Sequence, residues 1–165
     1  MMVSDVLVVI DLQNGVHSVD YPLANLERVL DGVNQRIAMY RDAGKPVIFV
    51  QHVDEALVIG NDAWALMPEL DCRHDDIYVN KTHANSFFKT ELPAILASLD
   101  VEKIEFCGAQ TEYCVDTTVR FAHGLGFDSY MVRGLHTTAD SDLMDAETIM
   151  AHHESLWDKR FLTFL

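Results

Sequence analysis

The fold of this chain is decided by Val6-Leu7-Val8-Val9-Ile10-Asp11, five apolar and mostly β-branched residues that end at a carboxylate. A continuous apolar run of this length is typical of a strand covered on both faces, which is the environment of a parallel sheet. Further short runs lie at residues 47–50, 77–79, 104–107, 130–132 and, most weakly, 161–164. We therefore expect six strands in one mostly parallel sheet.

Segments with helical periodicity separate these strands. Apolar residues recur every three or four positions from Leu23 to Tyr40, which predicts a helix over about residues 23–43. Shorter patterns predict helices at about 90–99, 112–123 and 142–156, the last led by Ser141 as its N-cap. Alternating strands and helices predict right-handed crossovers and a Rossmann-like, three-layer αβα sandwich in the α/β class.

Composition and charge exclude several classes of protein. The chain has 165 residues, 49% hydrophobic and 23% charged, so we expect a single globular domain over residues 1–165. Its net charge of −14 repels phosphate backbones and anionic lipids, so neither nucleic acid nor a membrane is an expected partner. No apolar run approaches the roughly 20 residues that cross a bilayer, and no basic segment opens the chain, which favours a cytoplasmic location.

Three polar residues follow apolar strand runs, where ligands of open α/β sheets bind. Asp11 follows the first strand, Lys81 the third and Cys114 the fourth. Each also has a purely structural interpretation, because Asp often ends a turn, Lys is usually a solvated surface charge and Cys often fills a core. Function depends on whether the three meet at one edge of the sheet.

The surroundings of Cys114 favour a chemical role. Thr111 is a plausible helix N-cap that makes Cys114 the third helical residue, in the field of a helix N-terminus. That field and a nearby ammonium are expected to lower the thiol pKa from about 8.5 toward neutrality. Unpaired N–H groups of the first turn are also available to an oxyanion. Cys107, inside a strand run, is expected to be buried packing, and an odd number of cysteines disfavours a disulfide scaffold.

Three segments, in this order, resemble the isochorismatase-like cysteine hydrolases, a superfamily that includes nicotinamidases, N-carbamoyl amidases and isochorismatase: VVIDLQN (8–14), KTHANSF (81–87) and GAQTEYCV (108–115). The resemblance implies that Cys114 is the nucleophile, Asp11 takes and returns its proton, and Lys81 orients Asp11 and favours the thiolate. It also implies a cis peptide between Ala109 and Gln110, and an oxyanion hole made by the N–H groups of Gln110 and Cys114.

The activity implied by this resemblance is cleavage of a C–N bond in a small amide or carbamoyl-type substrate through a thioester, with no cofactor. Two alternatives remain open: hydrolysis of a vinyl ether, as in isochorismatase, and an inactive binding module on the same scaffold. A nucleotide-binding protein is disfavoured, because no glycine-rich phosphate motif follows a strand. Members of the family commonly assemble, so a homo-oligomer is expected.

A metal site is not expected either. Nicotinamidases of the superfamily carry an Asp-x-His pair and a further His after the second strand. Here the second strand runs into Gln51-His52-Val53-Asp54, with the Asp on the wrong side of the His, and the next histidine is His74. Ligands at other spacings are the alternative.

The candidate substrate-binding residues are aromatic. The irregular stretch at about residues 53–75 is longer than a normal connection and is a candidate lid or binding loop. It contains Trp64, while Phe87 and Tyr113 lie near the expected edge of the sheet. Aromatic side chains beside a core often serve packing instead, which is the competing interpretation for all three.

Overall fold

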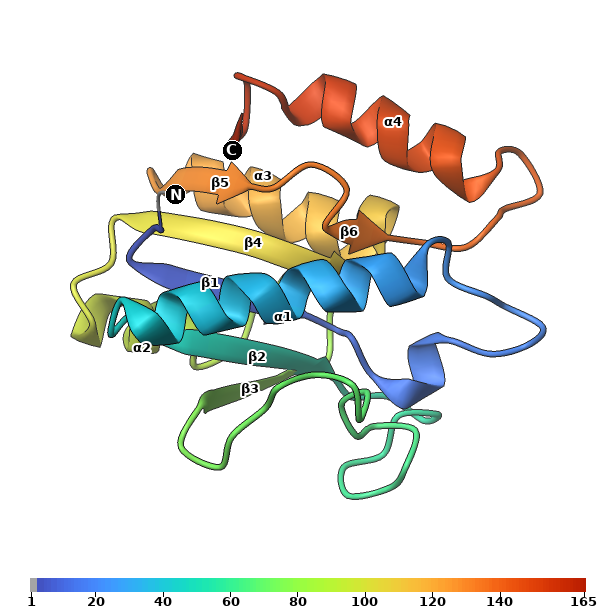
Figure 1. Ribbon diagram of the computed structural model, residues 1–165, viewed down its shortest axis with the longest axis horizontal. Coiled ribbons are helices and arrows are strands. Elements are labelled where there is room, and N and C mark those ends of the chain that lie inside the picture. The colour runs from blue at the N-terminus through green and yellow to red at the C-terminus, as the bar shows by residue number, and fades with distance from the viewer. Residues whose placement is uncertain (1–2) are drawn as a thin grey trace.

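A parallel sheet runs through the centre of the molecule (Figure 1), in a computed structural model that describes residues 3–165. Its strands are β1 (Val6–Ile10), β2 (Val47–His52), β3 (Ile77–Lys81), β4 (Lys103–Ala109), β5 (Asp128–Met131), β6 (His136–Thr137) and β7 (Thr163–Phe164). They are ordered β3-β2-β1-β4-β5-β7, and β6 pairs with the carboxyl end of β4. Every pairing between these strands is parallel. The predicted α/β class and parallel sheet are confirmed.

Helices cover both faces of this sheet. In Figure 1, α1 (Leu26–Asp42) crosses in front of it and α3 (Asp116–Gly124) lies behind it. Val6, Val8 and Ile10 pack in the apolar cluster that includes residues of α2 (Leu92–Ser98), α3 and α4 (Ala146–Trp157). Leu7 and Val9 pack in the second cluster, with α1. Successive residues of β1 point to opposite faces, so both must be covered, and the expected three layers result.

Residues 3–165 form seven strands, where the sequence predicts six. The additional strand is β6, whose two residues are polar and therefore gave no apolar signal. They are buried beside Gly108 and Ala109 of β4. The prediction that Ser141 is the N-cap of α4 is also wrong. The N-cap is Asp145, whose side chain accepts the Thr148 N–H at 2.7 Å. Ser141 instead accepts the Met144 N–H within the preceding turn.

One glycine lets the central strands approach each other. Gly108 has φ +126° and lies opposite Ile10 in the pairing of β1 with β4. A Cβ at position 108 would lie 2.1 Å from the Ile10 carbonyl oxygen, so only glycine fits there. Cys107, its neighbour, is buried in the cluster with α1, as expected.

The strand register brings four chain segments to one edge. Ile10 pairs with both Val50 and Gly108, and His52 pairs with Lys81. The carboxyl ends of β1, β2, β3 and β4 therefore lie side by side. Within residues 3–165, no helix has the length and apolar character needed to cross a bilayer.

Candidate active site

The three residues singled out at strand ends lie together in the structure. Lys81 Nζ is 2.7 Å from Asp11 Oδ2 and donates to Cys114 Sγ at 3.1 Å. Asp11 is 3% exposed and Lys81 1% exposed, while Cys114 is partly buried. A carboxylate, an ammonium and a thiol from three separate segments are therefore in contact at one edge of the sheet.

Backbone geometry directs each of these side chains. Asp11 has φ +50°, which turns the chain out of β1, and its N–H donates to the Val50 carbonyl at 2.9 Å. Lys81 is the last residue of β3. Cys114 lies in a π-helical turn, Thr111–Val115, that continues directly into α3. Single π-helical turns are frequent at functional sites.

The turn that holds Cys114 differs in detail from the one predicted. The N-cap position belongs to Gln110, whose backbone is extended, and not to Thr111. Thr111 is fully buried inside the turn, and its hydroxyl lies 2.8 Å from His136 Nδ1. The Ala109–Gln110 peptide is cis, as the resemblance implies. Gln110 and Cys114, the residues expected to supply oxyanion N–H groups, both line the same cavity.

The electrostatics of the site reverse one expectation. Burial, and then the negative charge of Asp11, raise the pKa of the Cys114 thiol to about 12 despite the opposing effect of Lys81. The prediction of a thiol pKa near neutrality is therefore wrong for the resting site, because burial outweighs the ammonium. Burial also raises the pKa of Asp11, and the positive charge of Lys81 opposes this rise.

His52 is a fourth member of the site, and sequence reasoning missed it. Its Nδ1 lies 3.0 Å from Lys81 Nζ, and its Nε2 lies 3.6 Å from Asp54 Oδ2. Burial, and then the charge of Lys81, lowers the pKa of His52, so Nδ1 accepts a hydrogen bond from the ammonium. The signal that points to His52 is its place at the end of β2, in register with Lys81.

Asp11, His52 and Cys114 are also potential metal ligands. One ligand atom from each lies within 4.8 Å of the others. Lys81 Nζ is 2.7, 3.0 and 3.1 Å from the same three residues, so the ammonium occupies the position at which they converge. A divalent ion would have to displace a hydrogen-bonded positive charge, and the residues therefore do not fit a metal site. His74 is on the surface, with its side chain 99% exposed.

A cavity of about 310 Å³ opens over Cys114. It is lined by Asp11, Gly15, Val16, Tyr21, His52, Asp54, Ala56, Leu57, Gln110, Tyr113 and Cys114. The irregular stretch after β2 contributes to this lining, as a binding loop would. Of the three aromatic candidates for substrate binding, Tyr113 lies in the cavity.

The other two aromatic candidates lie elsewhere. Trp64 lines a separate cavity, and its Nε1 donates to Asn80 Oδ1 at 3.2 Å. Phe87 is 5% exposed and packs against Phe121 and Phe127. Phe87 therefore packs in the core, which is the structural interpretation that competes with substrate binding.

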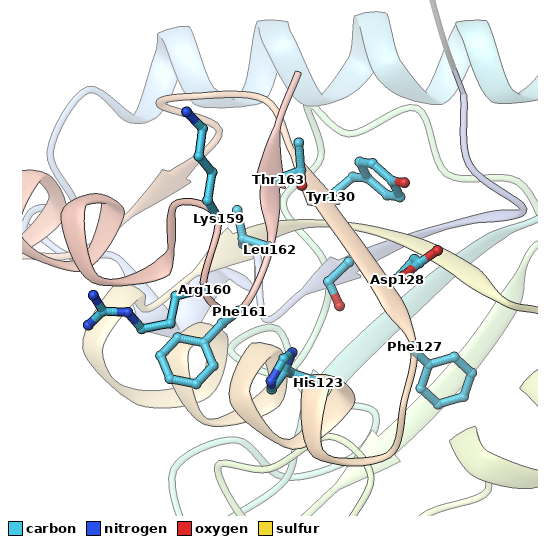
Figure 2. A pocket seen from close by; sticks show the side chains of 10 residues that line it. His123, Phe127, Asp128, Tyr130, Lys159, Arg160, Phe161, Leu162 and Thr163 are labelled. Atoms are coloured by element: carbon cyan, nitrogen blue, oxygen red, sulfur yellow. The ribbon is translucent and has the colours of Figure 1, made fainter.

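A further cavity, of about 200 Å³, lies beside β5 and the segment that leads into β7 (Figure 2). None of the residues that surround Cys114 lines it. Figure 2 shows the side chains of Lys159 and Arg160 pointing in different directions, and Asp128 lying on the other side of the strands. The charged groups of this cavity do not converge on a common point.

Comparisons with known proteins agree with this architecture. The family model described as Isochorismatase domain matches residues 5–155. A crystal structure of an isochorismatase family protein is 46% identical, with a TM-score of 0.96, and the match covers 97% of this chain and 96% of that one.

Curated relatives with named activities include a streptothricin hydrolase and a ureidoacrylate amidohydrolase. Streptothricin hydrolase of Streptomyces noursei is 30% identical over 140 residues, which is 81% of this chain and 50% of that protein. Ureidoacrylate amidohydrolase of Pseudomonas syringae pv. syringae is 26% identical over 153 residues, which is 69% of this chain and 62% of that protein. The chain therefore spans between half and two thirds of the length of these two relatives.

Proposed function

Because this chain belongs to the isochorismatase family, we propose that it is a cysteine-dependent hydrolase that cleaves a C–N bond of a small amide or carbamoyl-type substrate without a metal. The observation that carries this proposal is the contact of Lys81 Nζ with both Asp11 and Cys114 beside a cavity. One relative is named an amidohydrolase, which supports C–N chemistry.

The first step is transfer of the Cys114 proton to Asp11. A thiol with a pKa of about 12 is rarely ionised alone at neutral pH, so it needs a base. Burial raises the pKa of Asp11, which makes this carboxylate a stronger base than an exposed one. Asp11 Oδ1 has no hydrogen-bond partner within residues 3–165, which leaves an acceptor for the proton. Lys81 contacts both groups, so the negative charge stays beside an ammonium throughout the transfer.

The thiolate then attacks the substrate carbonyl carbon. A C–S bond forms, and the carbonyl oxygen takes the negative charge and accepts from the N–H groups of Gln110 and Cys114. As the tetrahedral intermediate collapses, Asp11 returns the proton to the leaving nitrogen and the C–N bond breaks. The products of this half-reaction are a free amine and a thioester on Cys114.

Water completes the cycle. Asp11, again ionised, takes a proton from the water as the oxygen attacks the thioester, and the same two N–H groups hold the second oxyanion. The C–S bond breaks, the acid leaves, and Cys114 recovers its proton. The overall balance is amide plus water giving acid plus amine.

His52 is a positioning residue in this scheme. By accepting from Lys81 at 3.0 Å, it holds the ammonium in the position that serves both Asp11 and Cys114. The charge of Lys81 is thereby directed without being neutralised, because the imidazole is uncharged.

The experiment that tests the proposal is a screen of amides, carbamoyl compounds and isochorismate with the wild-type protein and Cys114→Ser. We expect amine release, a covalent acyl adduct on Cys114 by mass spectrometry, and loss of turnover by at least about 10³-fold in the variant, with substrate still bound. Full turnover by Cys114→Ser would reject the thioester route and favour vinyl ether hydrolysis. Binding without turnover of any compound would favour the inactive module.

A further inference from the structure

Asp54 places a fixed negative charge on the wall of the Cys114 cavity. Its Oδ1 accepts from the backbone N–H groups of Ala56 and Leu57, both at 2.8 Å. These bonds lower the pKa of Asp54, so it is ionised at neutral pH. Its Oδ2 faces His52 Nε2 at the long distance of 3.6 Å, and the side chain is 48% exposed. One carboxylate oxygen therefore remains available to a ligand.

Within residues 3–165, no lysine or arginine side chain lines the cavity beside Asp54. The Lys81 side chain is fully buried and its ammonium is committed to Asp11, His52 and Cys114. A substrate carboxylate in this cavity would lose hydration and meet a like charge, which is a costly combination.

Two tyrosines add a second feature that favours cations. Tyr21 and Tyr113 line the same cavity and are 41% and 53% exposed. Aromatic ring faces attract ammonium and guanidinium groups, and the attraction adds to that of a nearby carboxylate. The wall thus combines an ionised carboxylate, two accessible aromatic rings and no lysine or arginine.

We infer that the cavity takes amide substrates that carry a cationic group, such as an alkylammonium, and that Asp54 is the specificity-determining residue that recognises this group. The choice of an amide rests on the proposed function. The charge preference belongs to the cavity wall and is measurable without turnover. Amides that carry a carboxylate are accordingly poor substrates.

Thiol reagents of different charge test the inference on the intact protein. Three methanethiosulfonates are compared: the trimethylammonioethyl, the methyl and the sulfonatoethyl reagent. Each transfers its thioalkyl group to a thiolate and releases methanesulfinate. For each reagent, the rate constant for Cys114 is divided by the rate constant for 2-mercaptoethanol, an uncharged thiol, which corrects for the reagent's intrinsic reactivity. Peptide mass spectrometry distinguishes modification of Cys114 from modification of Cys72.

Two variants isolate the role of Asp54. Asp54→Asn removes the charge but keeps an oxygen for the Ala56 and Leu57 N–H groups. Glu55→Gln removes the same charge from an exposed neighbour outside the cavity lining. A unit charge about 7 Å away in a largely aqueous dielectric changes the rate of each charged reagent about two- to threefold, in opposite directions.

We expect the cationic reagent to react fastest and the anionic one slowest with the wild-type protein. Asp54→Asn should lower the cation-to-anion ratio about fivefold, and Glu55→Gln less than about twofold. Equal effects of the two variants, or no charge preference in the wild-type protein, would overturn the inference.

A binding measurement separates this inference from the proposed function. Calorimetric titration of Cys114→Ser with benzyltrimethylammonium and with benzoate requires no nucleophile. We expect the cation to bind, benzoate not to bind, and Asp54→Asn to lose most of the affinity for the cation. Benzoate binding as tightly as the cation would overturn the inference. If Cys114 reacts with none of the reagents while the cation still binds, the proposed nucleophile fails and the charge selection stands.

Discussion

Lys81 Nζ lies 2.7 Å from Asp11 Oδ2, and both side chains are almost completely withdrawn from water, at 0% and 4% exposure. Two opposite charges in such a place depend on each other, because either one alone is an uncompensated buried ion. The same ammonium also contacts His52 and Cys114. The charges of Lys81 and Asp11 therefore act directly on the ionisation of the thiol.

Lys81→Met should abolish turnover and lower the free energy of unfolding by roughly 3–5 kcal/mol, because the buried Asp11 carboxylate loses its counter-ion. Urea denaturation measures the second effect. The control is Lys45→Met, since Lys45 pairs with Asp5 at 3.3 Å on the surface and such a pair contributes about 1 kcal/mol or less. Equal costs for the two substitutions would contradict the account of the pair.

Asp11→Asn should abolish turnover yet accelerate alkylation of Cys114 at neutral pH. The charge of Asp11 raises the pKa of the thiol, so its removal lowers that pKa and increases the thiolate fraction. In the wild-type protein, alkylation by neutral iodoacetamide should rise continuously between about pH 6 and pH 10, because the thiol pKa is about 12. A plateau near pH 7 in the wild-type profile would refute this explanation.

His52→Leu should lower kcat about 10- to 100-fold with little change in KM, because Lys81 loses the acceptor that orients its ammonium. His52→Asn offers an oxygen near the position of Nδ1 and should restore most of the activity. His74→Leu, a substitution of an exposed histidine, is the control and should leave kcat unchanged. Failure of the Asn variant to recover would mean that His52 acts by packing alone.

Glu154→Gln should destabilise the protein by roughly 1–3 kcal/mol at pH 7 and have almost no effect near pH 2. The hydrogen bond with buried His136, followed by that from the Gly134 N–H, lowers the pKa of Glu154 to about 2. A lowered pKa stabilises the fold above the unfolded value of about 4.5, and this contribution is lost as the pH falls toward 2. Thermal unfolding across this range measures it, with Glu147→Gln, at an exposed position of α4, as the control.

Gly108→Ala should prevent folding or cost more than about 3 kcal/mol, because the new Cβ would lie 2.1 Å from the Ile10 carbonyl at a φ of +126°. Gly124→Ala is the matched control, since nothing lies within 4 Å of a Cβ at the end of α3. Circular dichroism on heating compares the two. A Gly108→Ala protein as stable as Gly124→Ala would show that β1 and β4 can move apart at little cost.

Much of the fold was predictable because the strands are buried on both faces. Continuous runs such as Val6–Ile10 have 0% exposure, and that degree of burial leaves a strong apolar signal in the sequence. β6 left no such signal, because His136 and Thr137 are buried by pairing and hydrogen bonding. The cap of α4 was missed because Ser141 and Asp145 have similar capping propensities and only the path of the chain separates them.

The sequence by itself determined which polar residues end the strands, Asp11 and Lys81 among them, because a parallel sheet places its ligand-binding groups at strand ends. Only the tertiary structure decided that His52 joins them, since the pairing of β2 with β3 brings its ring to the ammonium. It also decided that the thiol pKa rises, because burial depends on what packs over the sulfur and no local pattern encodes that.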